Sequence, residues 1–317
     1  MMRPLAPLVR RAKRFCVDRP QLKRRVKRLG YAGLEWLGHG LGPGLDGGPR
    51  LLGYHTVGDG ENDLSVSAAQ FRGQLEWLLR RKFHICTLRQ WAAHVRTGQR
   101  IAPRTVVLSF DDGFRSLSDR VAPVLAEYGL TATVFVVTDY VGATNAFDEP
   151  FRQGPELPLL SWNELEALQR SGWDIQAHGR RHLPMVQLDS DVLEEEAAGS
   201  KLILERRLGR PVDFFSYPYG AFDLTAVDVL RRAGYLGAVT CRSGILPTRP
   251  DQDWFRLPRT LVDGLVSPGY FSAVFRRGFL RLSAADRWLQ GPACAQECPF
   301  DELDKLTPMP PLQATPA

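Results

Sequence analysis

The sequence predicts an α/β domain with a largely parallel sheet, preceded by a helical extension. Two observations support this prediction. The chain has 317 residues, of which 44% are hydrophobic and 24% charged, a composition that allows a substantial buried core. After residue 48, short apolar runs alternate with segments whose apolar residues recur at helical spacing, as in folds built from β-α units. We therefore expect one large domain with extensions.

Six apolar runs are expected to form strands of this sheet, because each is short and is followed by a polar turn or a helical pattern. They span residues 51–54, 105–110, 131–137, 173–177, 214–217 and 237–240. A parallel sheet would place the carboxyl ends of these strands at the same edge.

Two helices are predicted over 68–81 and 190–208. Ser67 is a suitable cap for the first helix, since its hydroxyl can accept a hydrogen bond from a free backbone N–H. The buried side of this helix is expected to contain Phe71, Leu75, Leu78 and Leu79. The apolar positions of the second helix are Val192, Leu202 and Leu208.

The two ends of the chain differ in composition from its centre, and they divide it into four parts. Residues 1–37 are expected to be a basic helical extension and 38–48, with six glycines, a linker. Residues 49–290 form the main domain. Residues 291–317 contain six prolines and are expected to be an irregular tail.

The N-terminal extension accounts for the net charge of +6. Residues 1–30 carry eleven Lys or Arg and one acid, so the remaining 30 basic and 34 acidic residues give the body a net charge of −4. No nucleic-acid partner is expected. Leu22, Val26 and Leu29 share one side of a basic helix, which could contact an anionic membrane surface or pack on the main domain.

Cysteine usage and hydropathy favour a cytoplasmic location, peripheral at the inner membrane face if residues 1–30 contact lipid. The five cysteines are few, odd in number and mostly scattered, which argues against a disulfide framework. They are Cys16, Cys86, Cys241, Cys294 and Cys298. Residues 1–30 lack the apolar stretch of about 7–15 residues that export requires, and no run approaches the roughly 20 residues of a membrane span.

The first chemical motif is Asp111-Asp112-Gly113, which directly follows the strand predicted over 105–110. Two adjacent carboxylates at the end of an apolar strand repel each other and lose hydration, so a positive charge is needed to offset them. A metal ion is one candidate. Capping of the helix that follows is the alternative.

The second motif, His178-Gly-Arg-Arg-His182, follows the strand predicted over 173–177. On a helical turn, two histidines at i and i+4 project from one face within reach of one ion. The carboxylates and imidazoles then meet at the carboxyl ends of strands, where β/α folds place their sites. This convergence favours a metal site over simple capping.

The third motif, Tyr217-Pro-Tyr-Gly220, ends the strand predicted over 214–217. Its turn could leave a backbone N–H pointing into the site, where it would stabilise an oxyanion. An aromatic strand end that only packs is the alternative.

Together, Ser109-Phe-Asp-Asp-Gly113, His178-xxx-His182 and Tyr217-Pro-Tyr-Gly220 resemble the polysaccharide deacetylases of carbohydrate esterase family 4, the NodB homology group. The resemblance extends over roughly residues 50–262, and the Tyr-His pair ending at His55 is similar to the branch that deacetylates poly-N-acetylglucosamine. It implies a distorted (β/α) barrel with fewer than eight repeats.

The resemblance also implies roles for individual residues. Asp112, His178 and His182 would hold one divalent ion, Asp111 would be the general base, and the backbone N–H of Tyr219 would help to bind the oxyanion. General chemistry agrees, because a metal lowers the pKa of water and an adjacent carboxylate can accept its proton. The ion is expected to be Zn²⁺, although Co²⁺ and Ni²⁺ suit the same ligands.

Three departures from the family pattern concern the surroundings of the ion. Gly179 stands where a Ser or Thr usually follows the first histidine. Ser216 replaces the Arg that commonly opens the third motif, so Arg259 is predicted to orient the base instead. No histidine follows His182, so His55 is predicted to be the general acid.

The resulting hypothesis is a metal-dependent hydrolase that removes N-acetyl groups from an amino sugar in a polysaccharide, oligosaccharide or lipid-linked glycan. Removal of a formyl group or an O-acetyl group is a competing reaction. A catalytically silent relative that binds carbohydrate is the alternative outside enzymes.

Overall fold

A computed structural model describes residues 27–33, 35–36, 45, 48–58, 64–148, 155–276 and 279. The predictions for residues 1–26, for most of the linker and for the proline-containing tail lie outside this part of the chain. The same holds for Cys16, Cys294 and Cys298.

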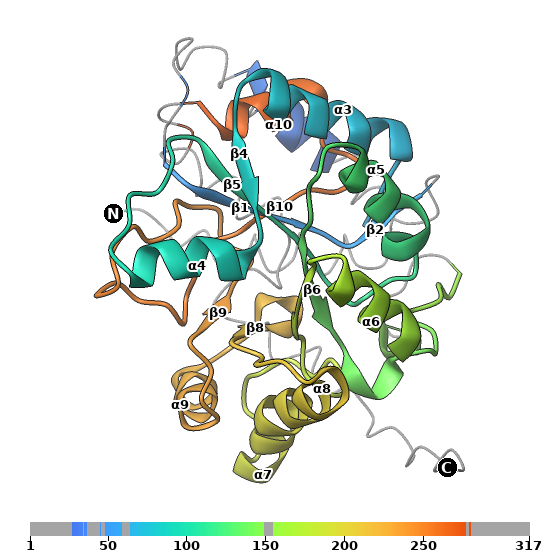
Figure 1. Ribbon diagram of the computed structural model, residues 1–317, viewed down its shortest axis with the longest axis vertical. Helices are drawn as coiled ribbons and strands as arrows, with labels where there is room; N and C mark the ends of the chain where they lie inside the picture. The colour runs from blue at the N-terminus through green and yellow to red at the C-terminus, as the bar shows by residue number, and fades with distance from the viewer. Residues whose placement is uncertain are drawn as a thin grey trace, which may run out of the picture.

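A curled parallel sheet of eight strands occupies the centre of the molecule (Figure 1). The order along the sheet is β10-β1-β5-β6-β7-β8-β9, and β4 also pairs with β5. The strands are β1 (Arg50–Tyr54), β4 (His84–Cys86), β5 (Thr105–Phe110), β6 (Thr133–Val136), β7 (Asp174–Ala177), β8 (Phe214–Ser216), β9 (Gly237–Val239) and β10 (Thr260–Leu261). All six predicted strands are present, each within two residues of its expected bounds. Two short strands, β2 (Thr56–Val57) and β3 (Ser65–Val66), pair separately.

The segment before β10 closes this sheet. Val239 at the end of β9 bridges Leu257, and Thr260 of β10 pairs with Leu52 of β1. The chain between Leu257 and Thr260 thereby joins the last strand to the first. This closure produces the distorted (β/α) barrel that the sequence resemblance implied.

The helices lie around the outside of the curled sheet (Figure 1). They are α3 (Ala68–Arg80), α4 (Leu88–Arg96), α5 (Ala122–Glu127), α6 (Trp162–Arg170), α7 (Ser190–Glu194), α8 (Ser200–Leu208), α9 (Leu224–Arg232) and α10 (Pro268–Val274). The start of α3 is as predicted: the Ser67 side chain accepts a hydrogen bond from the backbone N–H of Gln70. Phe71, Leu75 and Leu78 are buried, and Leu79 is partly buried.

The helical region 190–208 is present, but its predicted apolar side is only partly confirmed, since Leu208 packs half-buried against the core and Leu202 does not. Leu202 is 47% exposed, whereas Leu193 and Leu204 are fully buried. A π-helical turn, Glu195–Gly199, separates α7 from α8, and its buried residues are Glu196 and Ala197. The buried side therefore includes a carboxylate and small residues, which a search for large apolar residues does not find.

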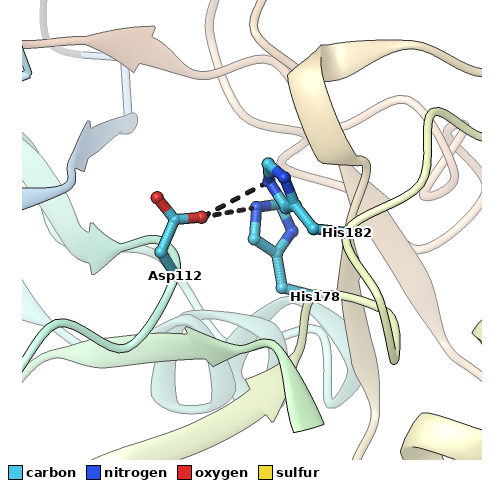
Figure 2. Close-up of side chains that lie close together, drawn as sticks. All are labelled: Asp112, His178 and His182. Carbon is cyan, nitrogen blue, oxygen red and sulfur yellow. Dashed lines mark ion pairs between the residues drawn. The ribbon is translucent and has the colours of Figure 1, made fainter. Parts of the chain in front are cut away.

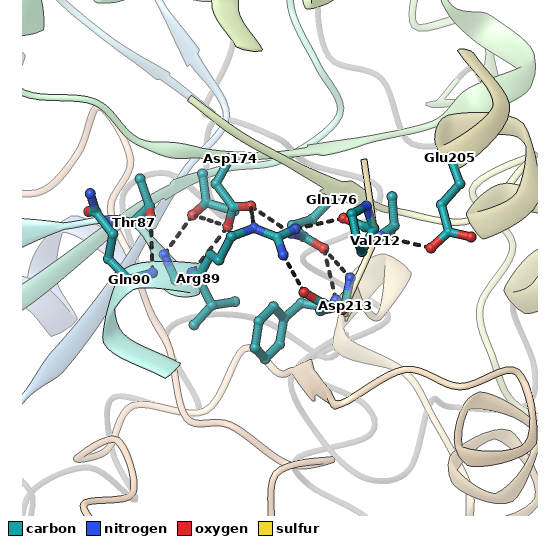
Figure 3. Close-up of polar contacts among 12 residues, drawn as sticks. Thr87, Arg89, Gln90, Asp174, Gln176, Glu205, Val212 and Asp213 are labelled. Carbon is teal, nitrogen blue, oxygen red and sulfur yellow. Dashed lines mark hydrogen bonds and ion pairs between the residues drawn. The ribbon is translucent and has the colours of Figure 1, made fainter. Parts of the chain in front are cut away.

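A polar network joins the segments at the amino-terminal ends of several strands (Figure 3). Asp174, the buried first residue of β7, accepts hydrogen bonds from Arg89 Nε at 3.0 Å and Gln176 Nε2 at 2.6 Å. Arg89, in the first turn of α4, also pairs with Asp213 just before β8. The network stabilises the end of the barrel at which these strands begin. The carboxyl ends of the strands, where β/α folds place their active sites, lie at the opposite end.

The described part of the N-terminal extension is helical at residues 27–33 and 35–36. Tyr31 is buried against Tyr270 of α10, with ring centroids 4.4 Å apart, and Ser267 donates a hydrogen bond to Glu35. Leu29 is 68% exposed, so it does not pack on the main domain, which was one of the two alternatives for its side of the helix. Within the described residues, no helix has both the length and the apolar character needed to cross a membrane.

Candidate metal centre

The carboxyl ends of β5, β7 and β8 carry the three sequence motifs. Asp111 and Asp112 directly follow β5, His178 directly follows β7, and Tyr217 directly follows β8. Because these strands are parallel and belong to one curled sheet, their carboxyl ends converge on one end of the barrel. The site is therefore built from residues distant in sequence.

The side chains of Asp112, His178 and His182 face one another, and all three are buried (Figure 2). One carboxylate oxygen of Asp112 lies 3.4 Å from Nε2 of His178 and 3.4 Å from Nε2 of His182. Ligand atoms bound at about 2.0–2.1 Å in a tetrahedral zinc site are about 3.3–3.4 Å apart. Both Asp112–histidine separations therefore fit a single shared ion, and the three ligand atoms all lie within 4.8 Å of one another.

The hydrogen bonding of the cluster also suits an ion. Oδ1 of Asp112 is buried and has no hydrogen-bond partner among the described residues. A buried polar atom without a partner is costly, and a cation would satisfy it. Nδ1 of His178 lies 2.7 Å from the carbonyl oxygen of Ser216. With its proton on Nδ1, this imidazole presents the Nε2 lone pair to the ion.

The backbone of the histidine motif differs from the helical turn that the sequence predicted. Residues 178–184 are not helical, and both Gly179 (φ 80°) and His182 (φ 62°) are left-handed. Asp112 (φ 68°) is left-handed as well. A non-glycine residue in this region costs on the order of 1–3 kcal/mol, so the rest of the fold must hold the loops in place. The two imidazoles meet because the loop reverses direction.

Glu196 holds the loop of residues 178–184, here called the histidine loop, in place. Its buried carboxylate accepts hydrogen bonds from the backbone N–H groups of Arg180 (2.8 Å) and Arg181 (3.0 Å). A Cβ atom on Gly179 would lie 2.7 Å from the same carboxylate oxygen. The close approach of Glu196 thus explains why glycine, rather than Ser or Thr, follows the first histidine. No motif in the sequence indicates this role, because Glu196 lies in an acidic stretch.

Arg259 lies where the sequence placed it, beside the predicted base. Its Nη1 donates a hydrogen bond of 2.6 Å to Asp111, and its Nη2 donates one of 3.0 Å to the Ser216 hydroxyl. Burial alone would raise the pKa of Asp111, but the charges of Arg259, His178 and His55 outweigh burial and lower it. The carboxylate of Asp111 is therefore held in its ionised form.

His55, the predicted general acid, follows β1 and lies at the same end of the barrel. Tyr54 pairs with Phe110, and the backbone N–H of Asp111 donates to the Tyr54 carbonyl at 2.9 Å. The positive charge of His55, when present, lowers the pKa of both Asp111 and Asp112. Its location is thus compatible with the role, which stays a prediction.

Tyr219 contributes its side chain to the site. Its backbone is left-handed (φ 57°), and its ring lies 4.5 Å from the ring of His182, centroid to centroid. Its hydroxyl donates a hydrogen bond of 3.4 Å to Asp148. Binding of an oxyanion by its backbone N–H stays a prediction.

Asp148 is a site residue that sequence reasoning missed. It ends the short 3₁₀ turn Ala146–Asp148, and its Oδ1 lies 3.7 Å from Nδ1 of His182. Burial and the nearby charge of Asp112 raise the pKa of Asp148 to about 7. The residue follows no predicted strand and belongs to none of the three motifs, so only the folded chain reveals it.

The two imidazoles differ in their electrostatic surroundings. Burial lowers the pKa of His182 to about 3, and the neighbouring His178 contributes to this shift against the opposing effect of Asp112. Burial would also lower the pKa of His178, but Asp111 and Asp112 outweigh it and raise the pKa. His182 is thus neutral, the form that binds metals. Asp111 and Asp112 favour a positive charge at His178, and a bound metal ion would supply a positive charge at the same place.

Comparisons with known proteins identify relatives of this chain. Residues 98–238 match the sequence profile of a family described as polysaccharide deacetylase. The chain is 27% identical over 207 residues to the poly-beta-1,6-N-acetyl-D-glucosamine N-deacetylase of Staphylococcus epidermidis, covering 62% of this chain and 68% of that protein.

Two solved structures share the fold. IcaB from Ammonifex degensii has a TM-score of 0.61 and 21% identity, with 78% of this chain and 99% of that one covered. The Streptococcus pyogenes deacetylase PplD, determined in complex with acetate, has a TM-score of 0.60 and 21% identity, with 72% and 98% covered.

Proposed function

Because this chain belongs to the polysaccharide deacetylase family, we propose that it is a metal-dependent hydrolase that removes N-acetyl groups from an amino-sugar glycan. The name of the staphylococcal relative makes β-1,6-linked N-acetylglucosamine the first substrate to test. The observation that supports the proposal best is the buried Asp112–His178–His182 cluster beside a base candidate, Asp111, that is paired with a buried arginine.

In this proposal, Asp112, His178 and His182 hold one divalent ion, with zinc as the expected metal. When bound, the ion supplies Lewis acidity, which polarises an acyl carbonyl and makes water more acidic. The match between the observed 3.4 Å separations and tetrahedral ligand spacing supports this assignment.

The remaining residues handle protons and charge. Asp111 accepts a proton from the water that adds to the acetyl carbon, and Arg259 keeps this carboxylate ionised and oriented. The backbone N–H of Tyr219 donates to the oxygen that becomes negative. His55 then donates a proton to the leaving nitrogen as the C–N bond breaks, so that acetate and a free amine are released.

The direct test is acetate release from oligomers of β-1,6-linked N-acetylglucosamine, measured on the zinc-loaded protein. We expect D111N to retain zinc and to lose about 10²–10⁴-fold in turnover, because it removes the proton acceptor but no ligand. D119N, which changes an exposed aspartate outside the site, is the matched control and should keep full activity.

Formylated and O-acetylated glycans belong in the same assay, since the ion and base could act on other acyl groups. Release of formate alone, or of acetate from esters alone, would replace the proposed reaction. A wild-type protein that binds zinc and glycan, but releases no acid from any of these substrates, would identify a silent binding relative.

A further inference from the structure

The two imidazoles of the cluster differ at the nitrogen that faces away from Asp112. Nδ1 of His178 contacts the carbonyl oxygen of Ser216 at 2.7 Å. Nδ1 of His182 is buried and has no hydrogen-bond partner among the described residues. A buried nitrogen of this kind needs an acceptor when it carries the proton.

The turn Ala146–Asp148 supplies two groups to His182. The ring of Phe147 packs on the imidazole, with centroids 4.6 Å apart, and Oδ1 of Asp148 lies 3.7 Å from Nδ1. The ring of Tyr219 also packs on the imidazole. The rings of Phe147 and Tyr219 and the carboxylate of Asp148 therefore all lie beside the imidazole of His182, in addition to the other two members of the cluster.

The carboxylate of Asp148 is itself held by hydrogen bonds. Tyr219 donates its hydroxyl to Oδ1, and Asn145 donates its side-chain amide to Oδ2, each at 3.4 Å. Asn145 is buried and also accepts a hydrogen bond of 2.7 Å from the backbone N–H of Leu157. The position of Asp148 is thus set by contacts that do not involve the ligand cluster.

We propose that Asp148 is a positioning residue for the metal site, whose carboxylate accepts a hydrogen bond from Nδ1–H of His182. The inference rests on the metal site proposed above. A movement of about 0.5 Å would bring the two atoms from 3.7 Å into the usual range of hydrogen bonds, which ends near 3.2 Å.

Such a contact would act through the tautomer of His182. Neutral imidazole carries one proton, and the tautomer with the proton on Nε2 cannot bind an ion through that nitrogen. A carboxylate beside Nδ1 favours the other tautomer and makes Nε2 more basic. The two histidines would then be oriented by different acceptors: a backbone carbonyl for His178 and a carboxylate for His182.

The test is the zinc dissociation constant of the purified full-length protein, measured by competition with a chromogenic chelator. D148A should weaken zinc binding about 10–100-fold, the usual effect of losing such a partner. D148N should weaken it less, because the amide oxygen can still accept the hydrogen bond. D263N, which alters another buried carboxylate hydrogen-bonded to a tyrosine, is the matched control and should bind zinc like the wild type.

The absorption spectrum of the cobalt-substituted protein gives a second measurement, because its bands depend on the basicity of the ligands. We expect altered bands in D148N but not in D263N. If D148A does not fold, the test relies on D148N. An unchanged cobalt spectrum together with an unchanged zinc dissociation constant in D148N overturns the inference. In a folded D148A, affinity within about twofold of the wild type, or an equal loss in D263N, also overturns it. Wild-type protein that binds no zinc would instead contradict the proposed metal site itself.

Discussion

Arg259 shows how a single buried charge is balanced in this site. Its guanidinium is fully buried and donates hydrogen bonds to Asp111, to the Ser216 hydroxyl and to the Thr240 carbonyl. These bonds satisfy the cation, and the cation in turn compensates the buried carboxylate. The small side chain of Ser216 leaves room for Arg259, which reaches the site from the segment directly before β10.

We expect R259M to lower the free energy of unfolding by about 3–5 kcal/mol, because it leaves Asp111 buried without its counter-ion. The measurement is denaturant unfolding at pH 7 in the presence of a chelator. R256M, which removes an exposed arginine paired with Asp253, is the control and should change little. A loss in R259M no larger than that in R256M would contradict the role of the pair.

The same variant has a defined pH dependence. The folded-state pKa of Asp111 is lower than its ordinary value, so its ion pair stabilises the protein above about pH 4 and is lost as the pH falls through the lowered pKa. The difference in stability between wild type and R259M should therefore be largest near neutral pH and should shrink on acidification. A difference that grows at low pH would be inconsistent with this pair.

At the scale of elements, the π-helical turn between α7 and α8 determines the shape of the histidine loop. The turn buries Glu196, and its carboxylate binds two backbone N–H groups of the loop. Arg181 Nε also donates to this carboxylate at 2.7 Å. The loop therefore depends on a helix that begins eight residues after His182.

We expect G179A to destabilise the protein more than an ordinary left-handed glycine substitution, and to weaken zinc binding. Gly129 provides the matched control, because it has a similar φ of 65° but open space where a Cβ would lie. G129A should cost about 1–2 kcal/mol from backbone strain alone. In G179A the added methyl group must also displace the Glu196 carboxylate.

Denaturant unfolding and zinc titration of both variants measure this difference. Equal losses of stability, together with unchanged zinc affinity in G179A, would show that Glu196 does not shape the loop.

At the scale of the whole molecule, the proposed ion joins segments that follow β5 and β7, on either side of β6. It would therefore couple distant parts of the barrel at the end opposite the Arg89–Asp174 network. A ligand that binds only the folded state raises the stability of the whole domain.

Removal of the metal should lower the melting temperature, and zinc should restore it in a concentration-dependent way. At a free zinc concentration 100 times the dissociation constant, the added stability is about 2.7 kcal/mol. Calorimetry with and without a chelator measures the shift. D112N, which weakens one ligand, should show a smaller response, and a wild-type melting temperature insensitive to zinc would argue against the site.

Much of the fold could be predicted because each strand and each motif is specified by a few residues that are consecutive in the sequence. The apolar run Thr105–Phe110 is buried along its whole length, and the acidic pair follows it without a gap. Parallel pairing then brings Asp111 close to the residue after Tyr54, which is His55. Prediction of Arg259 as the partner of the base rested on the family pattern: Ser216 replaces the usual arginine of the third motif, so another cation was needed to orient Asp111.

Short segments of the sequence specify which chemical groups are present and at which strand ends they lie, since apolar periodicity and adjacent polar motifs are local properties. The path of the histidine loop and the residues that support it depend instead on the folded chain. Glu196 and Asp148 come from segments with no motif, and they meet the loop through burial and hydrogen bonds across the fold. Contacts of this kind depend on the closure of the barrel, which brings together segments that are distant in the chain.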